Sequence, residues 1–147
     1  MANNYMQFCV YVPFEHEQEV AWVHAHRILS PEEMEDANVD KLSEHFGIPK
    51  EDLLDGPWPP ADMSVEADGF YMASEEGANL DAVGLFLSAF LEDNERSDII
   101  GIEWAEFCSK LRPGEFGGGA MAISAKDVIF ESTSTTLVKL RKLLKEK

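Results

Sequence analysis

The stretch 99–130 constrains the fold more than any other part of the chain, because it contains three β-strand patterns joined by connections too short for a crossover helix. The first pattern, Ile99–Leu111, is rich in β-branched and aromatic residues and ends at the turn Arg112-Pro113-Gly114. The second and third patterns cover Ala120–Ala125 and Val128–Glu131. We therefore predict two linked hairpins in which these three strands run antiparallel.

The loop before the second predicted strand contains three successive glycines, Gly117 to Gly119. A phosphate-binding P-loop needs a Lys and a Ser or Thr at the start of a helix, whereas these glycines lead into a strand. We interpret the loop as a wide β-bulge or kinked hairpin with Phe116 folded back as a plug, and a partner-binding loop is the alternative. The apolar alternation also changes phase near Trp104, which predicts a second bulge or a strand covered on both faces.

The remaining patterns predict elements that join or cover this sheet. Residues 79–91 form the most apolar helix pattern, with Asn79 as its N-cap, and this helix must be buried. We expect an α+β fold, with an antiparallel sheet of about four to five strands covered by the buried helix 79–91, N-terminal helices and a C-terminal helix. The other predicted elements are a strand at 5–12, a helix at 15–29, a capping box at 30–33, a helical hairpin at 42–54, a strand or hairpin at 64–74 and a helix at 136–147.

Length and cysteine content predict a single domain, 1–147, in a reduced, cytoplasmic protein. Cys9 and Cys108 are the two cysteines, and neither a signal-peptide pattern nor a membrane span is apparent. The longest apolar run, Ala82–Leu91, is about half of the ~20 residues that a membrane-spanning helix needs.

Charge is the strongest global feature, since 28 acidic and 12 basic residues give a formal net charge of −16. Residues 1–98 carry 22 acids and 4 bases, whereas residues 99–147 carry 6 acids and 8 bases. Such a field repels phosphate backbones and attracts basic surfaces. We therefore expect that the protein does not bind nucleic acid directly and that its partner is a basic, nucleic-acid-binding protein. The sequence leaves open whether the protein also forms a homodimer.

No sequence motif supports an enzyme, a cofactor or a metal site. His24 and His26 are two residues apart and cannot face one ion from a helix. Cys108 has no local histidine to activate it as a nucleophile. Glu103 and Glu106 fall on opposite faces of a strand, which argues against a carboxylate pair.

Two segments resemble a family of short, uncharacterised acidic proteins of bacteria, their phages and mobile elements. They are Ser74–Leu91 and the run from Trp104 that contains Cys108-Ser-Lys and Gly114-Glu-Phe-Gly-Gly-Gly. The resemblance implies no activity or ligand. It implies only a context in which small acidic proteins inhibit host defence systems.

From these features we expect a non-enzymatic, acidic protein-binding inhibitor, as a DNA mimic or an anti-defence protein of the anti-CRISPR or anti-restriction type. The alternatives are an immunity protein that neutralises a basic toxin nuclease and a small enzyme of unknown chemistry. The predicted partner-binding residues are Glu92, Asp93, Glu95, Asp98, Glu51, Asp52, Asp55 and Phe116.

Overall fold

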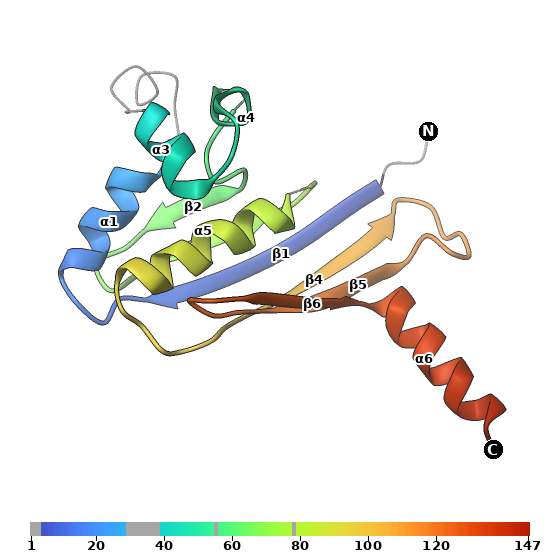
Figure 1. Cartoon of the computed structure of the whole chain (residues 1–147). Coiled ribbons are helices and arrows are strands. Elements are labelled where there is room, and N and C mark those ends of the chain that lie inside the picture. The colour runs from blue at the N-terminus through green and yellow to red at the C-terminus, as the bar shows by residue number, and fades with distance from the viewer. Residues whose placement is uncertain (1–3, 29–38, 55, 78) are drawn as a thin grey trace.

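A computed structural model describes residues 4–28, 39–54, 56–77 and 79–147. The chain forms an α+β fold around a six-stranded antiparallel sheet with strand order β2-β3-β1-β4-β5-β6 (Figure 1). The predicted fold class is confirmed, and the sheet has slightly more strands than expected. The strands are β1 (Asn4–Pro13), β2 (Asp62–Val65), β3 (Gly69–Ser74), β4 (Ile100–Cys108), β5 (Gly117–Ile123) and β6 (Val128–Ser132).

The C-terminal half of the sheet has the predicted antiparallel connections, β4 to β5 to β6. Two details of the prediction were wrong. The β4–β5 ladder is continuous from Ile100 to Glu106 and the β1–β4 ladder is continuous from Trp104 to Cys108, so neither ladder has a bulge between Trp104 and Glu106. Strand β5 begins at Gly117, and all three glycines pair with β4 inside the sheet.

The glycines are required where neighbouring chain segments approach closely. Gly118 has a φ of 151°, and a Cβ there would lie 2.3 Å from the carbonyl oxygen of Trp104. A Cβ at Gly119 would meet the Trp104 ring and the carbonyl oxygen of Glu131, both at 2.5 Å. The triple glycine therefore lets β5 fit between β4 and β6 under the indole ring.

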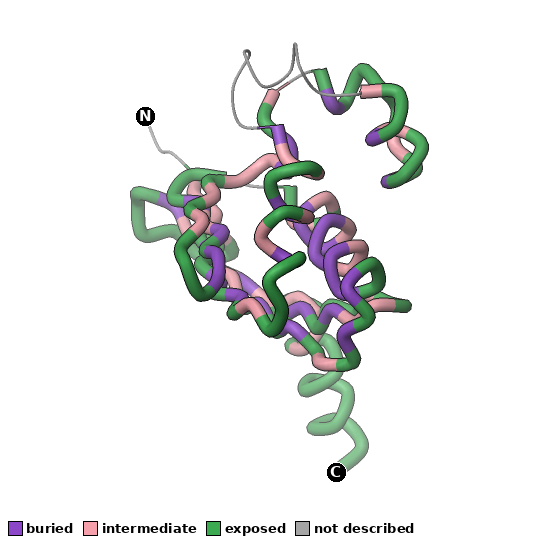
Figure 2. The backbone as a smooth tube through the Cα atoms, turned by 90° about the vertical axis from the view of Figure 1, so that its left-hand side faces the viewer, coloured by how far each residue is buried: buried purple, intermediate pink, exposed green. Residues whose placement is uncertain are grey.

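One face of the sheet is covered by helices, and the other face is open (Figures 1 and 2). Phe8, Val10 and Val12 of β1 are buried, while the alternating Cys9 and Tyr11 are exposed. This period of two is the pattern of a sheet that packs its core on one side only.

Helix α5 (Leu80–Asp93) supplies the largest part of the cover. The side chain of Asn79 accepts a hydrogen bond from the backbone N–H of Ala82 at 3.1 Å, which confirms the predicted cap. The buried residues of α5 are Val83, Gly84, Phe86, Leu87, Phe90 and Leu91. The other helices on this side are α1 (Gln18–His26), α3 (Val39–Phe46) and α4 (Lys50–Leu54). The predicted capping box at 30–33 lies outside the described residues.

Helix α3, a turn at Gly47 and helix α4 form the predicted helical hairpin. Trp58 follows it and is buried at 4% exposure against Phe46, with a ring-centroid distance of 5.1 Å. Trp58 therefore closes the edge of the core.

Helix α6 (Thr133–Lys145) is present but does not cover the sheet. It is N-capped by Ser132, and it projects from the end of β6 (Figure 1). All of its residues are exposed or half-buried, including Leu137, Leu140 and Leu144.

A buried ion pair joins the start of α1 to the segment after α5. Nη1 of Arg96 donates to Oε1 of Glu19 and to the carbonyl oxygen of Pro13, both at 2.8 Å. Glu19 is fully buried and accepts two further bonds at 3.1 Å, from the backbone N–H groups of Glu15 and His16. The two ions are therefore held in a closed hydrogen-bond network.

Candidate functional site

The acids predicted to bind a partner do not all present free carboxylates. Asp98 forms a bidentate pair with Arg96, at 3.0 and 2.8 Å. This hydrogen bonding holds the pKa of Asp98 below its usual value. Asp93 accepts a hydrogen bond from the Trp22 indole N–H at 2.8 Å and forms an ion pair with His45 at the same distance. Both acids therefore have structural roles, and Asp55 lies outside the described residues.

The other predicted acids are exposed, and among the described residues no salt bridge involves Glu51, Asp52, Glu92 or Glu95. They do not form one patch. Asp52 lines a groove beside the first turn of α5, whereas Glu92 lies in the last turn of that helix. A helix of 14 residues is about 20 Å long, so Asp52 and Glu92 lie near opposite ends of α5.

Phe116 is 57% exposed and lies beside Glu115 in a shallow surface depression. The prediction that it folds back as a plug was wrong. The Trp104 ring occupies the position over the glycines instead.

Two neighbouring surface grooves are lined by several carboxylates, and we call them the acidic grooves. They share Pro57 and Pro60 as lining residues. The first has a volume of about 480 Å³ and contains Asp52 and Asp81, with apolar side chains that include Ile48 and Leu85. The second has a volume of about 430 Å³ and contains Asp62, Glu75 and Glu76.

No basic residue is among the described residues that line the acidic grooves. Five carboxylates thus come together from α4, β2, the connection after β3 and the start of α5. Only Asp52 of these five was predicted as a site residue. A carboxylate beside an apolar wall is suited to a Lys or Arg side chain, whose aliphatic stem packs while its charged head pairs.

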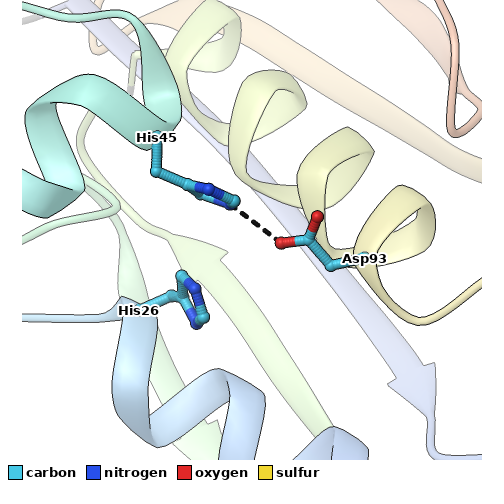
Figure 3. A group of neighbouring side chains, drawn as sticks. All are labelled: His26, His45 and Asp93. Carbon is cyan, nitrogen blue, oxygen red and sulfur yellow. Dashed lines mark ion pairs between the residues drawn. The ribbon is translucent and has the colours of Figure 1, made fainter.

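A second cluster lies where three helices meet, and it consists of His26 from α1, His45 from α3 and Asp93 from α5 (Figure 3). One ligand atom from each residue lies within 4.8 Å of the other two. The Nε2 atom of His45 is 2.8 Å from Oδ2 of Asp93. We call these three residues the His-His-Asp cluster.

Aromatic packing and hydrogen bonds fix the His-His-Asp cluster. The ring of His26 stacks on Trp22 with a centroid distance of 4.1 Å, and its Nδ1 lies 2.7 Å from the carbonyl oxygen of Trp22. Because a carbonyl oxygen only accepts, Nδ1 carries the proton and the lone pair is on Nε2. Burial is the main cause that lowers the pKa of His26, and this favours the neutral imidazole.

Sequence spacing did not reveal this cluster, because its members are far apart in the chain and only His26 was considered as a ligand. The nearest histidine in the sequence, His24, is exposed on the same helix. A local signal was nevertheless present, since Trp22 and His26 are four residues apart and must share one helix face.

The fold and these sites define a small, strongly acidic α+β protein with helices on one face of an antiparallel sheet. No family model, curated protein or solved structure matches the chain. None of the helices in the described residues is both long and apolar enough to cross a bilayer.

Proposed function

We propose that this protein is a non-enzymatic inhibitor that binds a basic, nucleic-acid-binding protein. The observation that carries the proposal is the pair of acidic grooves, where five carboxylates meet apolar walls and no basic residue is among the described lining. A surface that normally holds phosphates presents Lys and Arg side chains, and those side chains fit such grooves.

The distribution of charge supports an electrostatic role. Residues 133–147 carry five bases and one acid, so the other 132 residues have a net charge of −20. This exceeds the roughly 2–8 net charges that are enough to keep a small domain soluble. A field of this strength accelerates association with a basic partner at low ionic strength.

Inhibition follows if the partner cannot hold its nucleic acid and this protein at the same time. Anti-defence proteins that mimic DNA act in this way, and so does an immunity protein on a toxin nuclease. The identity of the captured partner separates these two roles.

The test begins with affinity capture of the partner from the native host and its identification by mass spectrometry. Association rates are then measured by stopped flow between about 50 and 300 mM salt, a range that spans weak to strong screening. An added duplex labelled with a fluorophore reports whether binding releases nucleic acid from the partner.

Three double charge reversals, each of which changes the net charge equally, locate the binding surface. Asp52→Lys with Glu75→Lys alters both acidic grooves, and Glu92→Lys with Glu95→Lys alters the far end of α5. Glu103→Lys with Glu146→Lys is the matched control on β4 and the C-terminal tail.

We expect the groove variant to associate at least tenfold more slowly at low salt, with a flatter salt dependence and an unchanged melting temperature, since its carboxylates are exposed. Equal slowing in all three variants would mean that only net charge matters. Association that is indifferent to salt would refute the electrostatic proposal altogether.

A further inference from the structure

We propose that the His-His-Asp cluster is a binding site for a divalent transition-metal ion, with Zn²⁺ as the best match. The ligands are Nε2 of His26, a ring nitrogen of His45 and a carboxylate oxygen of Asp93, and a water molecule completes a tetrahedron. Two imidazoles and one carboxylate are a donor set that suits Zn²⁺ and disfavours the oxygen-seeking ions Mg²⁺ and Ca²⁺.

The distances are close to those of a zinc site. With metal–ligand bonds of about 2.0–2.2 Å, the donor atoms of a tetrahedral site lie about 3.3–3.6 Å apart. In the structure the donors lie within 4.8 Å of one another, and the closest pair, His45 and Asp93, is 2.8 Å apart. Side-chain shifts of about 0.5–1.5 Å, without movement of the helices, therefore bring all three donors to one ion.

The contacts around the cluster orient the ligands. Histidines that bind a metal through one nitrogen donate their other N–H to a carbonyl or carboxylate, and the Nδ1–H of His26 donates to the Trp22 carbonyl. The indole N–H of Trp22 donates to Asp93 and so holds the carboxylate toward the two rings. One residue of α1 thus positions two of the three ligands.

The cluster is accessible to an ion from solvent. The side chains of His45 and Asp93 are 34% and 29% exposed, whereas His26 is half-buried against Trp22 and Phe46. The neighbouring cation is Lys41, and it opposes metal binding through its charge. The net charge of −16 of the whole chain acts in the other direction and concentrates cations near the surface.

A bound ion would join three helices that are connected mainly through side chains. His45 lies in α3, which leads through Gly47 into α4 and the wall of the first acidic groove. Metal binding would therefore fix the position of this helical hairpin over α1 and α5. The proposal does not depend on the partner-binding function, because its test uses the metal alone.

The test uses the full chain, treated with EDTA and desalted, and titrated with ZnCl₂ by isothermal titration calorimetry. Titration with CoCl₂ gives a second reading, since four-coordinate Co²⁺ absorbs more strongly in the visible range than the six-coordinate aqueous ion. We expect one equivalent of either metal to bind and a saturable rise in melting temperature with Zn²⁺.

The ligand variants are His45→Gln and Asp93→Asn, and His24→Ala is the matched control on the exposed side of α1. We expect both ligand variants to lose at least tenfold in affinity and the control to bind as the parent does. Near-ultraviolet circular dichroism confirms that each variant is folded, and a variant that fails this check is replaced by His26→Gln.

Two outcomes would overturn the proposal. One is a parent that binds no Zn²⁺ or Co²⁺ at stoichiometric concentration. The other is binding that survives in the ligand variants, which would place the metal on surface carboxylates.

Discussion

Replacing Arg96 by methionine should destabilise the fold strongly, because it leaves a buried carboxylate without its cation. The side chain of Arg96 is 2% exposed and that of Glu19 is fully buried, with 2.8 Å between Nη1 and Oε1. Methionine keeps most of the volume of the stem and removes only the charged head. The carbonyl oxygen of Pro13 also loses its donor.

The expected cost follows from what remains around Glu19. Breaking a buried ion pair from one side costs about 3–5 kcal/mol. Two backbone N–H groups still bond to Glu19 at 3.1 Å, so we expect the lower half of that range, about 3–4 kcal/mol. At about 2–4 °C per kcal/mol for a domain near this size, the melting temperature should fall by about 6–16 °C.

The assay is equilibrium unfolding in urea at pH 7, followed by far-ultraviolet circular dichroism. Arg112→Met is the matched control, because the pair of Arg112 with Glu115 spans 3.8 Å and is half exposed. We expect the control to lie within about 0.5 kcal/mol of the parent.

A double-mutant cycle measures the coupling between Glu19 and Arg96. Glu19→Gln removes the buried negative charge, so the double variant Glu19→Gln with Arg96→Met should be more stable than the sum of the two single effects by about 1–3 kcal/mol. An Arg96→Met variant within about 1 kcal/mol of the parent, or strict additivity in the cycle, would refute the assignment of a tightly coupled buried pair.

Three further predictions concern other parts of the fold. The pairing of Asp98 with Arg96 lowers the pKa of Asp98, so this pairing stabilises the protein above the unfolded pKa of about 3.9, and the contribution is lost as the pH falls through the lower folded pKa. The difference in melting temperature between the parent and Asp98→Asn should therefore be full at pH 7 and should shrink as the pH is lowered below about 3.9. Gly118→Val should cost at least about 2 kcal/mol in urea unfolding, because of its φ of 151° and the 2.3 Å approach to Trp104, whereas Gly101→Val, with open space around it, should be tolerated. Leu140→Ser on α6 should change thermal stability by less than about 1 kcal/mol, whereas Leu87→Ala in the core should cost about 2–5 kcal/mol; a large loss at Leu140 would show that α6 packs against the body in solution.

The elements themselves were largely predictable from local patterns. The alternation of Phe8, Val10 and Val12 identified β1, and the apolar run after Asn79 identified α5 together with its cap. These signals are strong because strand period, helix period and capping depend on residues within a few positions of one another. The sequence was misleading near Trp104, where the phase of burial changes although pairing continues.

The candidate sites could be predicted only in part. The negative charge of residues 1–98 was evident, and Asp52, one of the predicted partner-binding acids, lies in the first acidic groove. Asp62, Glu75, Glu76 and Asp81 were missed, because they come from separate elements that meet only around Pro57 and Pro60. Asp93 and Asp98 were taken for free surface acids, although their partners Trp22, His45 and Arg96 hold them in place.

The sequence by itself determined which segments are strands and helices and that three C-terminal strands are antiparallel neighbours. Tertiary structure alone decided that β1 lies between β3 and β4, that Glu19 and Arg96 are buried together, and that α6 projects from the sheet. The physical reason is the range of the interactions. Strand order, ion pairing and the meeting of His26, His45 and Asp93 depend on how distant faces pack, and local residue patterns contain no record of which faces will meet.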